Sequence, residues 1–292
     1  MIDRWLEDAA DSLAALGAGN PHFEAELLLA QALGRPRVFL FTHPEYEPDE
    51  NERRVLDELL GRRLAGEPLQ YVLGNAVFRH LTLRVGPGVL IPRAETEVLA
   101  GIALEALRAR RQEGPTAGKP WVVDVGVGSG AILLALMKEA ADLRFHPLGI
   151  DASPAALGCT LENAQANGLP RPHLIRGDLL SALSAVDPPT PVLAIVSNPP
   201  YVSTAEMRAL PPEIREHEPA TALHGGKDGL DVIRRLLDES LAFVGRGAFL
   251  CFEIGAMQEE AVRHELRLRG LLARASVHRD LAGRPRVVLV EP

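Results

Sequence analysis

The sequence predicts an α/β protein in which a small helical bundle precedes an open, mostly parallel sheet. Apolar side chains recur at helical spacing through residues 3–65, whereas short apolar strands alternate with helices from residue 121 onward. A chain of 292 residues is also long enough for two domains of ordinary size. We therefore expect a helical domain followed by a sheet domain.

Three helices are expected at the amino end, each with an apolar stripe. The stripes comprise Trp5, Leu6, Ala9, Leu13 and Leu16; Phe23, Leu27, Leu28 and Ala30; and Val55, Leu56, Leu59, Leu60 and Leu64. Gly17, Gly19 and Asn20-Pro21 separate the first two helices, because glycine ends helices and proline starts them. Residues 1–74 are thus predicted to form a helical domain.

A change of apolar period marks the next segment. Leu81, Leu83 and Val85 alternate with polar residues, which predicts a β-hairpin connector over residues 75–91. The second domain, residues 92–292, is expected to begin with a helix around 95–110. Its strand candidates are 122–125, 145–150, 173–176, 192–196 and 248–253, and a terminal antiparallel pair is expected at 275–278 and 286–290.

The composition excludes several classes of protein. A net charge of -8 argues against a protein whose main task is to grip nucleic acid through its phosphates. No apolar run approaches the roughly 20 residues needed to cross a bilayer, and the acidic start shows no secretory signal. Cys159, Cys251 and the scattered histidines lack metal-ligand spacing. We expect a cytoplasmic protein without a metal site.

A glycine-rich loop follows the first strand of the predicted sheet. It reads Asp124-Val-Gly126-Val127-Gly128-Ser129-Gly130 and leads into a helical run, 131–140. Small residues let a ligand approach the backbone, and the helix N-terminus offers N–H groups to a carboxylate or phosphate. The third glycine follows the second after two positions instead of three, which argues against an NAD site and suits a methyltransferase. The alternative is an ordinary strand-to-helix turn.

Two further acids end predicted strands. Asp151 follows the second strand, where its carboxylate could accept hydrogen bonds from two ribose hydroxyls. Asp178, which precedes Leu179, ends the third strand and could face an adenine amine. Because these acids and Asp124 are expected in register, we place them around one ligand. The alternative is that they serve as caps or turn residues.

The segment after the strand 192–196 reads Ser197-Asn198-Pro199-Pro200-Tyr201. An amide nitrogen is a poor nucleophile because its lone pair is delocalised, so an enzyme must orient it and stabilise charge. The Asn198 side-chain carbonyl and the Pro199 main-chain carbonyl could accept the two N–H bonds of a planar NH2 group. Pro200 would stiffen the loop and Tyr201 could pack against the target. The alternative is a rigid turn with a surface tyrosine.

Together these motifs resemble the class I, Rossmann-like fold of S-adenosylmethionine-dependent methyltransferases, and more narrowly the HemK/PrmC family of release factor glutamine methyltransferases. The resemblance covers nearly the whole chain. Further stretches that carry it are Gln70–Gly74, Ile91–Glu97, Glu218-Pro219, Ala222–Leu230 and Glu253–Gly255 with Gln258. Three departures are Val127 for a more usual threonine, Leu179 where an aromatic residue often flanks the adenine, and Ala94 for a common proline.

The resemblance implies a cofactor, a partner and a set of site residues. S-adenosylmethionine is expected to contact Asp124, Gly126, Val127, Gly128, Ser129, Gly130, Asp151, Asp178, Leu179 and Asn198. The catalytic residues are expected to be Asn198, Pro199 and Tyr201, which with Pro200 hold the glutamine of a Gly-Gly-Gln motif in a peptide chain release factor. The helical domain would dock this partner. A monomer without direct nucleic-acid or membrane binding is expected.

Some alternatives stay open. Adenine-specific DNA methyltransferases also use an Asn-Pro-Pro-Tyr loop on a planar NH2 group, but they must extrude a base and hold a phosphate backbone. A ribosomal-protein glutamine methyltransferase is a closer alternative, and only the helical domain and the stretch 91–97 argue against it. A non-catalytic module could share the fold, although intact Asp151 and Asn198 argue against it. Arg93, Glu97, Glu253 and Gln258 could be structural or could contact a ligand.

Overall fold

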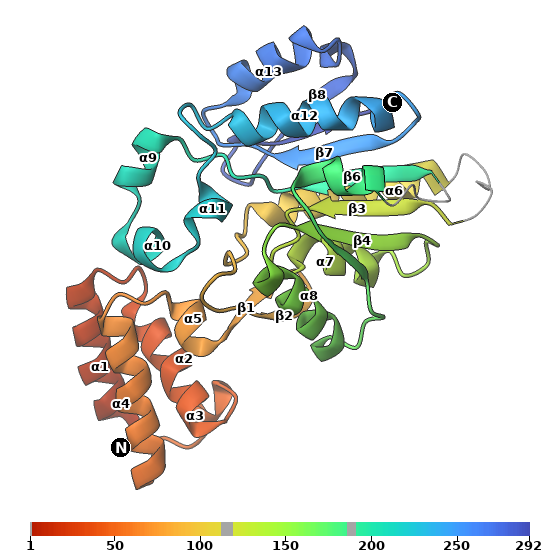
Figure 1. The fold of residues 1–292 in the computed structure, drawn as a ribbon. Coiled ribbons are helices and arrows are strands. Elements are labelled where there is room, and N and C mark those ends of the chain that lie inside the picture. Colours follow the sequence, from red (N-terminus) through yellow and green to blue (C-terminus); the bar gives the residue numbers. More distant parts are fainter. Residues whose placement is uncertain (1, 112–118, 186–190) are drawn as a thin grey trace. The chain divides into compact units, whose positions relative to one another are not determined.

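The computed structural model describes residues 2–111, 119–185 and 191–292. Contacts among its residues divide the chain into two compact units (Figure 1). Unit 1 runs to Asn75 and includes Pro211–His217, and unit 2 comprises Ala76–Leu210 and Glu218–Pro292. No helix in the described ranges combines the length and the apolar character needed to cross a membrane.

Unit 1 is a bundle of short helices. They are α1 (Ile2–Leu16), α2 (Pro21–Leu33), α3 (Val38–Thr42), α4 (Glu50–Leu64), α5 (Leu69–Leu73) and α10 (Pro212–His217). The three predicted helices are present as α1, α2 and α4; Asn20 caps α2, and Asp49 forms a capping box with Glu52 at α4. Helices α3 and α5 were not predicted, because five residues are too few to show a helical period.

The core of unit 1 encloses one charged side chain among its apolar ones. Leu13 and Leu28 are fully buried where α1 and α2 pack together. Arg63 of α4 is buried as well, with its guanidinium 2.8 Å from a carboxylate oxygen of Glu24 and 3.1 Å from one of Glu213. Two carboxylates offset the cost of burying this charge, so Arg63 ties α10 into the bundle.

Unit 2 is built on a seven-stranded sheet with the strand order β5-β4-β3-β6-β7-β9-β8. The strands are β3 (Trp121–Val125), β4 (His146–Asp151), β5 (His173–Arg176), β6 (Val192–Ser197), β7 (Phe249–Glu253), β8 (Ala275–Arg279) and β9 (Pro285–Val290). Strands β3 to β7 run parallel to one another, whereas β9 is antiparallel to its neighbours β7 and β8. This is the predicted sheet, and every strand bound lies within one residue of its prediction.

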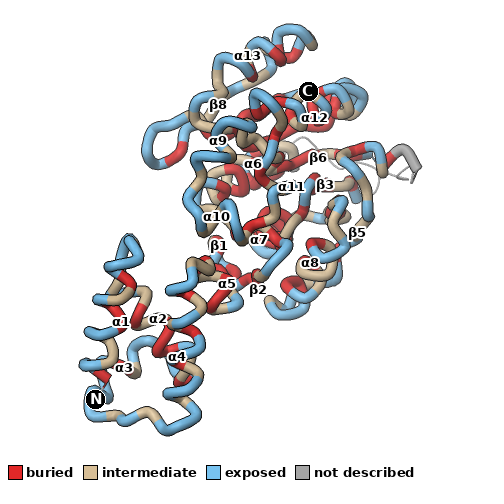
Figure 2. Tube along the Cα trace, turned by 60° about the vertical axis from the view of Figure 1, so that its left-hand side comes forward, coloured by how far each residue is buried: buried red, intermediate tan, exposed pale blue. Residues whose placement is uncertain are grey.

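Helices cover both faces of this sheet (Figure 1). On one face α6 (Thr96–Arg111) and α7 (Ala131–Glu139) pack against Val122, and on the other α12 (Asp231–Val244), α13 (Glu259–Leu268) and η1 (Leu179–Ala185) pack against Val123. Neighbouring residues of a strand point to opposite faces, so both faces are apolar and the strands are the most buried part of unit 2 (Figure 2). The remaining helices are α8 (Pro154–Ala166), α9 (Thr204–Ala209), α11 (Ala220–Leu223) and η2 (Leu272–Arg274).

A separate two-stranded hairpin precedes the sheet in the chain. It consists of β1 (Asn75–Phe78) and β2 (Leu81–Arg84), in agreement with the predicted change of period. Its buried side chains pack with residues of α7 and α8; they are Phe78, Leu81 and Leu83. At the turn, the Arg79 guanidinium binds both carboxylate oxygens of Glu139 in α7. The hairpin is therefore fixed to the helix that begins at the glycine-rich loop.

Candidate active site

Three parallel strands end at the same level in the middle of the sheet. Val125 of β3 is paired with Ile150 of β4 on one side and with Ser197 of β6 on the other. The residues that follow, Gly126, Asp151 and Asn198, all line one cavity of about 430 Å³. Pockets for small molecules usually measure roughly 300–1,000 Å³, so this cavity suits a ligand the size of a nucleoside derivative.

Most of the predicted ligand residues are brought together around this cavity. Those that line it are Gly126, Val127, Gly128, Ser129, Asp151, Asp178, Leu179, Asn198 and Pro200. Asp124, Gly130, Pro199 and Tyr201 lie outside its wall. The cavity belongs entirely to unit 2, and residues of α11 and α12 complete it.

The glycine-rich loop turns sharply between β3 and α7. The N–H groups of Gly126 and Val127 both donate to the Ile150 carbonyl, at 2.8 and 3.0 Å, which fixes the loop on the neighbouring strand. Gly130 has a φ of 84°, and a Cβ there would lie 2.9 Å from Leu134 Cδ1 and 3.0 Å from Thr160 Cγ2. Glycine is required at this position on both counts, because a side chain would be strained and would collide.

Helix α8 braces the same loop from outside. The Thr160 hydroxyl donates to the Gly128 carbonyl at 3.0 Å, and the buried Asn163 side chain donates to the Ser129 carbonyl at 2.8 Å. The Asn163 amide also exchanges hydrogen bonds with both backbone groups of Arg84 in the hairpin. The carbonyls of Gly128 and Ser129 are thus bound to α8, which fixes the loop from the side of that helix.

Asp151 presents a carboxylate whose orientation is fixed by the backbone. Oδ2 accepts from the Gly128 N–H at 2.9 Å, and Oδ1 accepts from the Ser153 N–H at 2.8 Å. Each carboxylate oxygen can accept a second hydrogen bond, so two neighbouring hydroxyl groups of a ribose fit the remaining positions. This geometry is compatible with the predicted contact of Asp151 with a ribose, which stays a prediction.

Asp124 differs from Asp151 because it is completely buried beneath the loop. Its Oδ2 accepts from the Leu133 N–H in the first turn of α7 at 3.0 Å, and Oδ1 has no hydrogen-bond partner among the described groups. Burial, with a smaller contribution from the charge of Asp151, raises its pKa from 3.8 to about 7. The side chain is thus placed to fix the start of α7, and it is separated from the cavity wall.

Asn198 is held by a buried chain of hydrogen bonds. Its side-chain nitrogen donates to the Thr96 hydroxyl at 3.2 Å, Thr96 donates to Glu253 Oε2 at 2.7 Å, and the Tyr201 hydroxyl donates to Glu253 Oε1 at 2.9 Å. Burial raises the pKa of Glu253 although the two hydroxyls oppose this, and burial together with Glu253 raises the pKa of Tyr201. One of the two N–H bonds of Asn198 is donated to Thr96, which sets the orientation of the amide, and no described group donates to its side-chain oxygen.

Thr96 and Glu253 are two site residues whose roles the sequence did not reveal. The sequence left open whether Glu253 is structural or contacts a ligand. It assigned no role to Thr96, which lies in the stretch Ile91–Glu97 that carries the family resemblance. Their contact joins the start of α6 to the end of β7, 157 residues apart in sequence. The other open candidates have structural contacts: Arg93 pairs with Glu218, and Glu97 accepts from the Arg79 N–H.

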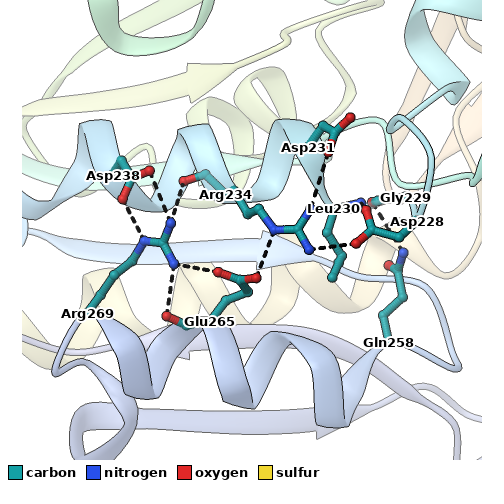
Figure 3. Close-up of polar contacts among 9 residues, drawn as sticks. All are labelled: Asp228, Gly229, Leu230, Asp231, Arg234, Asp238, Gln258, Glu265 and Arg269. Atoms are coloured by element: carbon teal, nitrogen blue, oxygen red, sulfur yellow. Dashed lines mark hydrogen bonds and ion pairs between the residues drawn. The ribbon is translucent and has the colours of Figure 1, made fainter.

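The Asn198–Tyr201 loop is supported on its outer side by a glycine-rich segment and by Gln258. Gln258 Nε2 donates to the carbonyls of Tyr201 and Gly229, at 2.9 and 3.2 Å. A Cβ at Gly229 would lie 2.3 Å from the Tyr201 oxygen, so the two backbones meet directly. Figure 3 shows that Asp228, beside Gly229, is bound by Arg234 of α12, which also binds Glu265 of α13.

Comparisons with known proteins match both units of the chain. One family model, the PrmC N-terminal domain, matches residues 4–74, and another, the methyltransferase small domain, matches residues 103–216. A release factor glutamine methyltransferase of Moorella thermoacetica is 40% identical over 287 residues, which is 97% of this chain and 96% of the relative. A protein of Deinococcus radiodurans with the same name is 39% identical over 284 residues, or 97% and 95% of the two chains.

Solved structures share the fold at low sequence identity. The hMettl16 catalytic domain in complex with MAT2A 3'UTR hairpin 6 matches with a TM-score of 0.57 and 15% identity, over 76% of this chain and 81% of that chain. The N-terminal domain of human METTL16 in complex with SAH matches with a TM-score of 0.51 and 15% identity, over 78% and 82%. These likenesses confirm the predicted fold class of unit 2.

We predict that Asp124→Asn removes a pH-dependent part of the stability. The folded chain keeps a proton on Asp124 up to about pH 7, whereas the unfolded chain releases it near pH 3.8. The stability that this proton contributes is complete below about pH 4 and is lost as the pH rises to about 7. Relative to wild type, the variant should therefore gain as much as about 3 kcal/mol of unfolding free energy between pH 4.5 and pH 8.

Urea denaturation at several pH values, without added ligand, measures this difference. The exposed residue Asp11 in α1 offers a matched control, because Asp11→Asn makes the same replacement at the surface and should not show this gain. A flat difference for Asp124→Asn as well would mean that the buried carboxyl titrates as in the unfolded chain.

Proposed function

Because the chain belongs to the family of release factor glutamine methyltransferases, as its motifs predicted, we propose that it methylates the glutamine of a release factor's Gly-Gly-Gln motif. The chain is an S-adenosylmethionine-dependent protein-glutamine N-methyltransferase. The observation that carries the residue assignment is the fixed orientation of Asn198, whose side-chain oxygen is left available at the cavity.

We propose that Asn198 and Pro199 hold the target amide through two acceptors. No described residue donates to the Asn198 side-chain oxygen or to the Pro199 carbonyl, so both can accept from the glutamine NH2 group. This pairing favours the pyramidalising nitrogen of the transition state over the planar ground state. When bound, S-adenosylmethionine would supply an electrophilic methyl group, its sulfur leaving as the neutral thioether, and the acidic proton of the methylated nitrogen would pass to water, so the scheme needs no dedicated base.

The cofactor assignment follows the arrangement of the cavity. Asp151 has two free acceptor positions for ribose hydroxyls, and the loop from Gly126 to Ser129 lines the cavity with two glycines and the mostly buried residues Val127 and Ser129. Tyr201 and Pro200 complete the target loop; the Tyr201 hydroxyl is bound to Glu253, so the residue stiffens the loop instead of acting as an acid or base. Thr96 and Glu253 are positioning residues in this scheme.

Unit 1 is proposed to dock the release factor. It contributes nothing to the cofactor cavity, yet it exposes apolar side chains on α3: Val38 is 62% exposed and Phe41 is 59% exposed. The Arg37 guanidinium lies 4.9 Å from the ring centroid of Phe23 and 5.6 Å from that of Phe41, so these groups form one patch. Exposed aromatic and arginine side chains are typical anchors of protein interfaces.

We also propose that the enzyme is a cytoplasmic monomer that does not bind nucleic acid directly. The net charge of -8 supports the last point, because binding through phosphates needs a positive surface. Relatives named for release factor methylation match nearly the full chain, including the helical unit, which favours this substrate over DNA or a ribosomal protein.

The proposed substrate can be tested by methyl transfer from labelled S-adenosylmethionine. Four acceptors should be compared in parallel: a release factor, the same protein with the motif glutamine changed to alanine, a ribosomal protein fraction and duplex DNA. We expect label on the intact release factor alone. Label on DNA or on the ribosomal fraction would keep the fold and the donor but overturn the partner.

Asn198→Ala should lower kcat by about 100-fold or more, because one of two acceptors for the target amide is lost. Thr96→Val keeps the shape of the side chain but frees the Asn198 amide to rotate, and it should lower kcat by about tenfold. In both variants the Kd of S-adenosylmethionine, measured by calorimetry, should rise by less than about threefold. Equal losses in donor affinity and turnover would show that Asn198 acts mainly on the cofactor.

For the docking patch, the double variant Val38→Ser, Phe41→Ser should raise KM for the release factor by about tenfold, the typical effect of removing interface anchors. Its kcat should not change, because the cavity lies in the other unit. The exposed apolar residue Leu268 on α13 provides a control, and Leu268→Ser should leave KM unaltered. If the double variant keeps the wild-type KM, this patch is not the docking surface.

A further inference from the structure

The end of the cavity beyond Asp151 is walled by the loop after β5 and by one side of α12. Asp178 and Leu179 of the loop line it together with Val232 and Arg235 of the helix. Leu179 has a φ of 51°, in the left-handed region that leucine rarely adopts. Such a conformation is strained for a branched side chain and persists only where the surroundings hold it.

Both neighbours of Leu179 are held from α12. The Leu180 N–H donates to Glu239 Oε2 at 2.8 Å, and Arg235 Nη2 donates to Asp178 Oδ2 at 2.8 Å. Arg235 and Glu239 are four residues apart on one side of the helix, and their charged atoms are 3.5 Å apart. Helix α12 thus holds the loop by one hydrogen bond on each side of Leu179.

The strand order indicates which part of the donor meets this wall. Strand β6 carries the proposed target loop, β4 ends at Asp151, and β5, on the far side of β4, leads to Asp178. In S-adenosylmethionine the ribose joins the adenine to the sulfonium end. With the sulfonium near Asn198 and the ribose at Asp151, the adenine falls beside the loop after β5.

We propose that Arg235 and Glu239 are positioning residues for the adenine. They hold Leu179 in its left-handed conformation, so that its side chain covers a face of the base. Arg235 also fixes the Asp178 carboxylate through Oδ2, and no residue in the described ranges donates to Oδ1, which stays available for the exocyclic amine. The inference rests on the proposed function in one respect: the roles proposed for Asn198 and Asp151 set the direction in which S-adenosylmethionine lies in the cavity.

The test is the Kd of S-adenosylmethionine, measured by titration calorimetry without a methyl acceptor. Glu239→Ala should raise this Kd about tenfold, the effect of losing a hydrogen bond to a charged group. The kcat at saturating donor should stay within about twofold, because the adenine is remote from the transferred methyl group. Glu239→Gln keeps an oxygen for the Leu180 N–H, so its Kd should remain within about threefold of wild type.

A matched control lies next to Glu239. Figure 3 shows Asp238 directed toward Arg269 of α13, at 2.7 Å, so Asp238→Ala removes the same charge from the same helix without touching the loop. Its Kd should be that of wild type. A Kd raised equally by Asp238→Ala, or a lower kcat with an unchanged Kd in Glu239→Ala, would overturn the proposal.

The role of the strained residue can be isolated with Leu179→Asn, because asparagine adopts the left-handed region more readily. In the Leu179→Asn background, Glu239→Ala should raise the Kd of S-adenosylmethionine by less than about threefold. The left-handed conformation then no longer depends on the hydrogen bond from the Leu180 N–H to Glu239. A tenfold rise in both backgrounds would overturn the proposal. Wild-type donor binding without methylation of a release factor would refute the proposed substrate and leave this test intact.

Discussion

The parallel register of β3, β4 and β6 is the constraint on which the rest of the site depends. Parallel strands bring their carboxyl ends to the same edge, so Gly126, Asp151 and Asn198 meet although 72 residues separate the first from the last. A shift of one residue in any of these strands would turn its side chains to the opposite face of the sheet. The buried side chains on both faces therefore fix the position of the site as well as the stability of the sheet.

Around this edge, the groups that face the cavity are oriented by contacts made behind it. Asp151 is aligned by two backbone N–H groups, and Asn198 is aligned because Thr96 accepts from its nitrogen. In each case one part of a polar group is satisfied by the protein and another is left for a ligand. A free amide or carboxylate would lose this orientation through rotation, and catalysis by positioning depends on avoiding that loss.

The sequence revealed the strands, the main helices and the loops that carry Gly126, Asp151 and Asn198, because these follow from local period and from motif spacing. It did not reveal Thr96 and Glu239 as supports, because their partners are distant in sequence and their residue types are common on helices and loops. Asp124 shows the opposite case. Its place in the motif predicted a ligand contact, whereas burial beneath the loop gives it a contact with α7.

Helix α12 supports both ends of the cavity, with different residues of the helix contacting each end. Arg234 binds Asp228, next to the Gly229 backbone that meets the target loop, while Arg235 and Glu239 bind the loop after β5. Exposed ion pairs contribute little to stability one by one, so stability alone does not account for this arrangement. Arg234 and Arg269 share the mostly buried carboxylate of Glu265, which couples α12 to α13. A displacement of α12 would then move the proposed adenine wall and the support of the target loop together, so the geometry of donor and acceptor sites has a common origin.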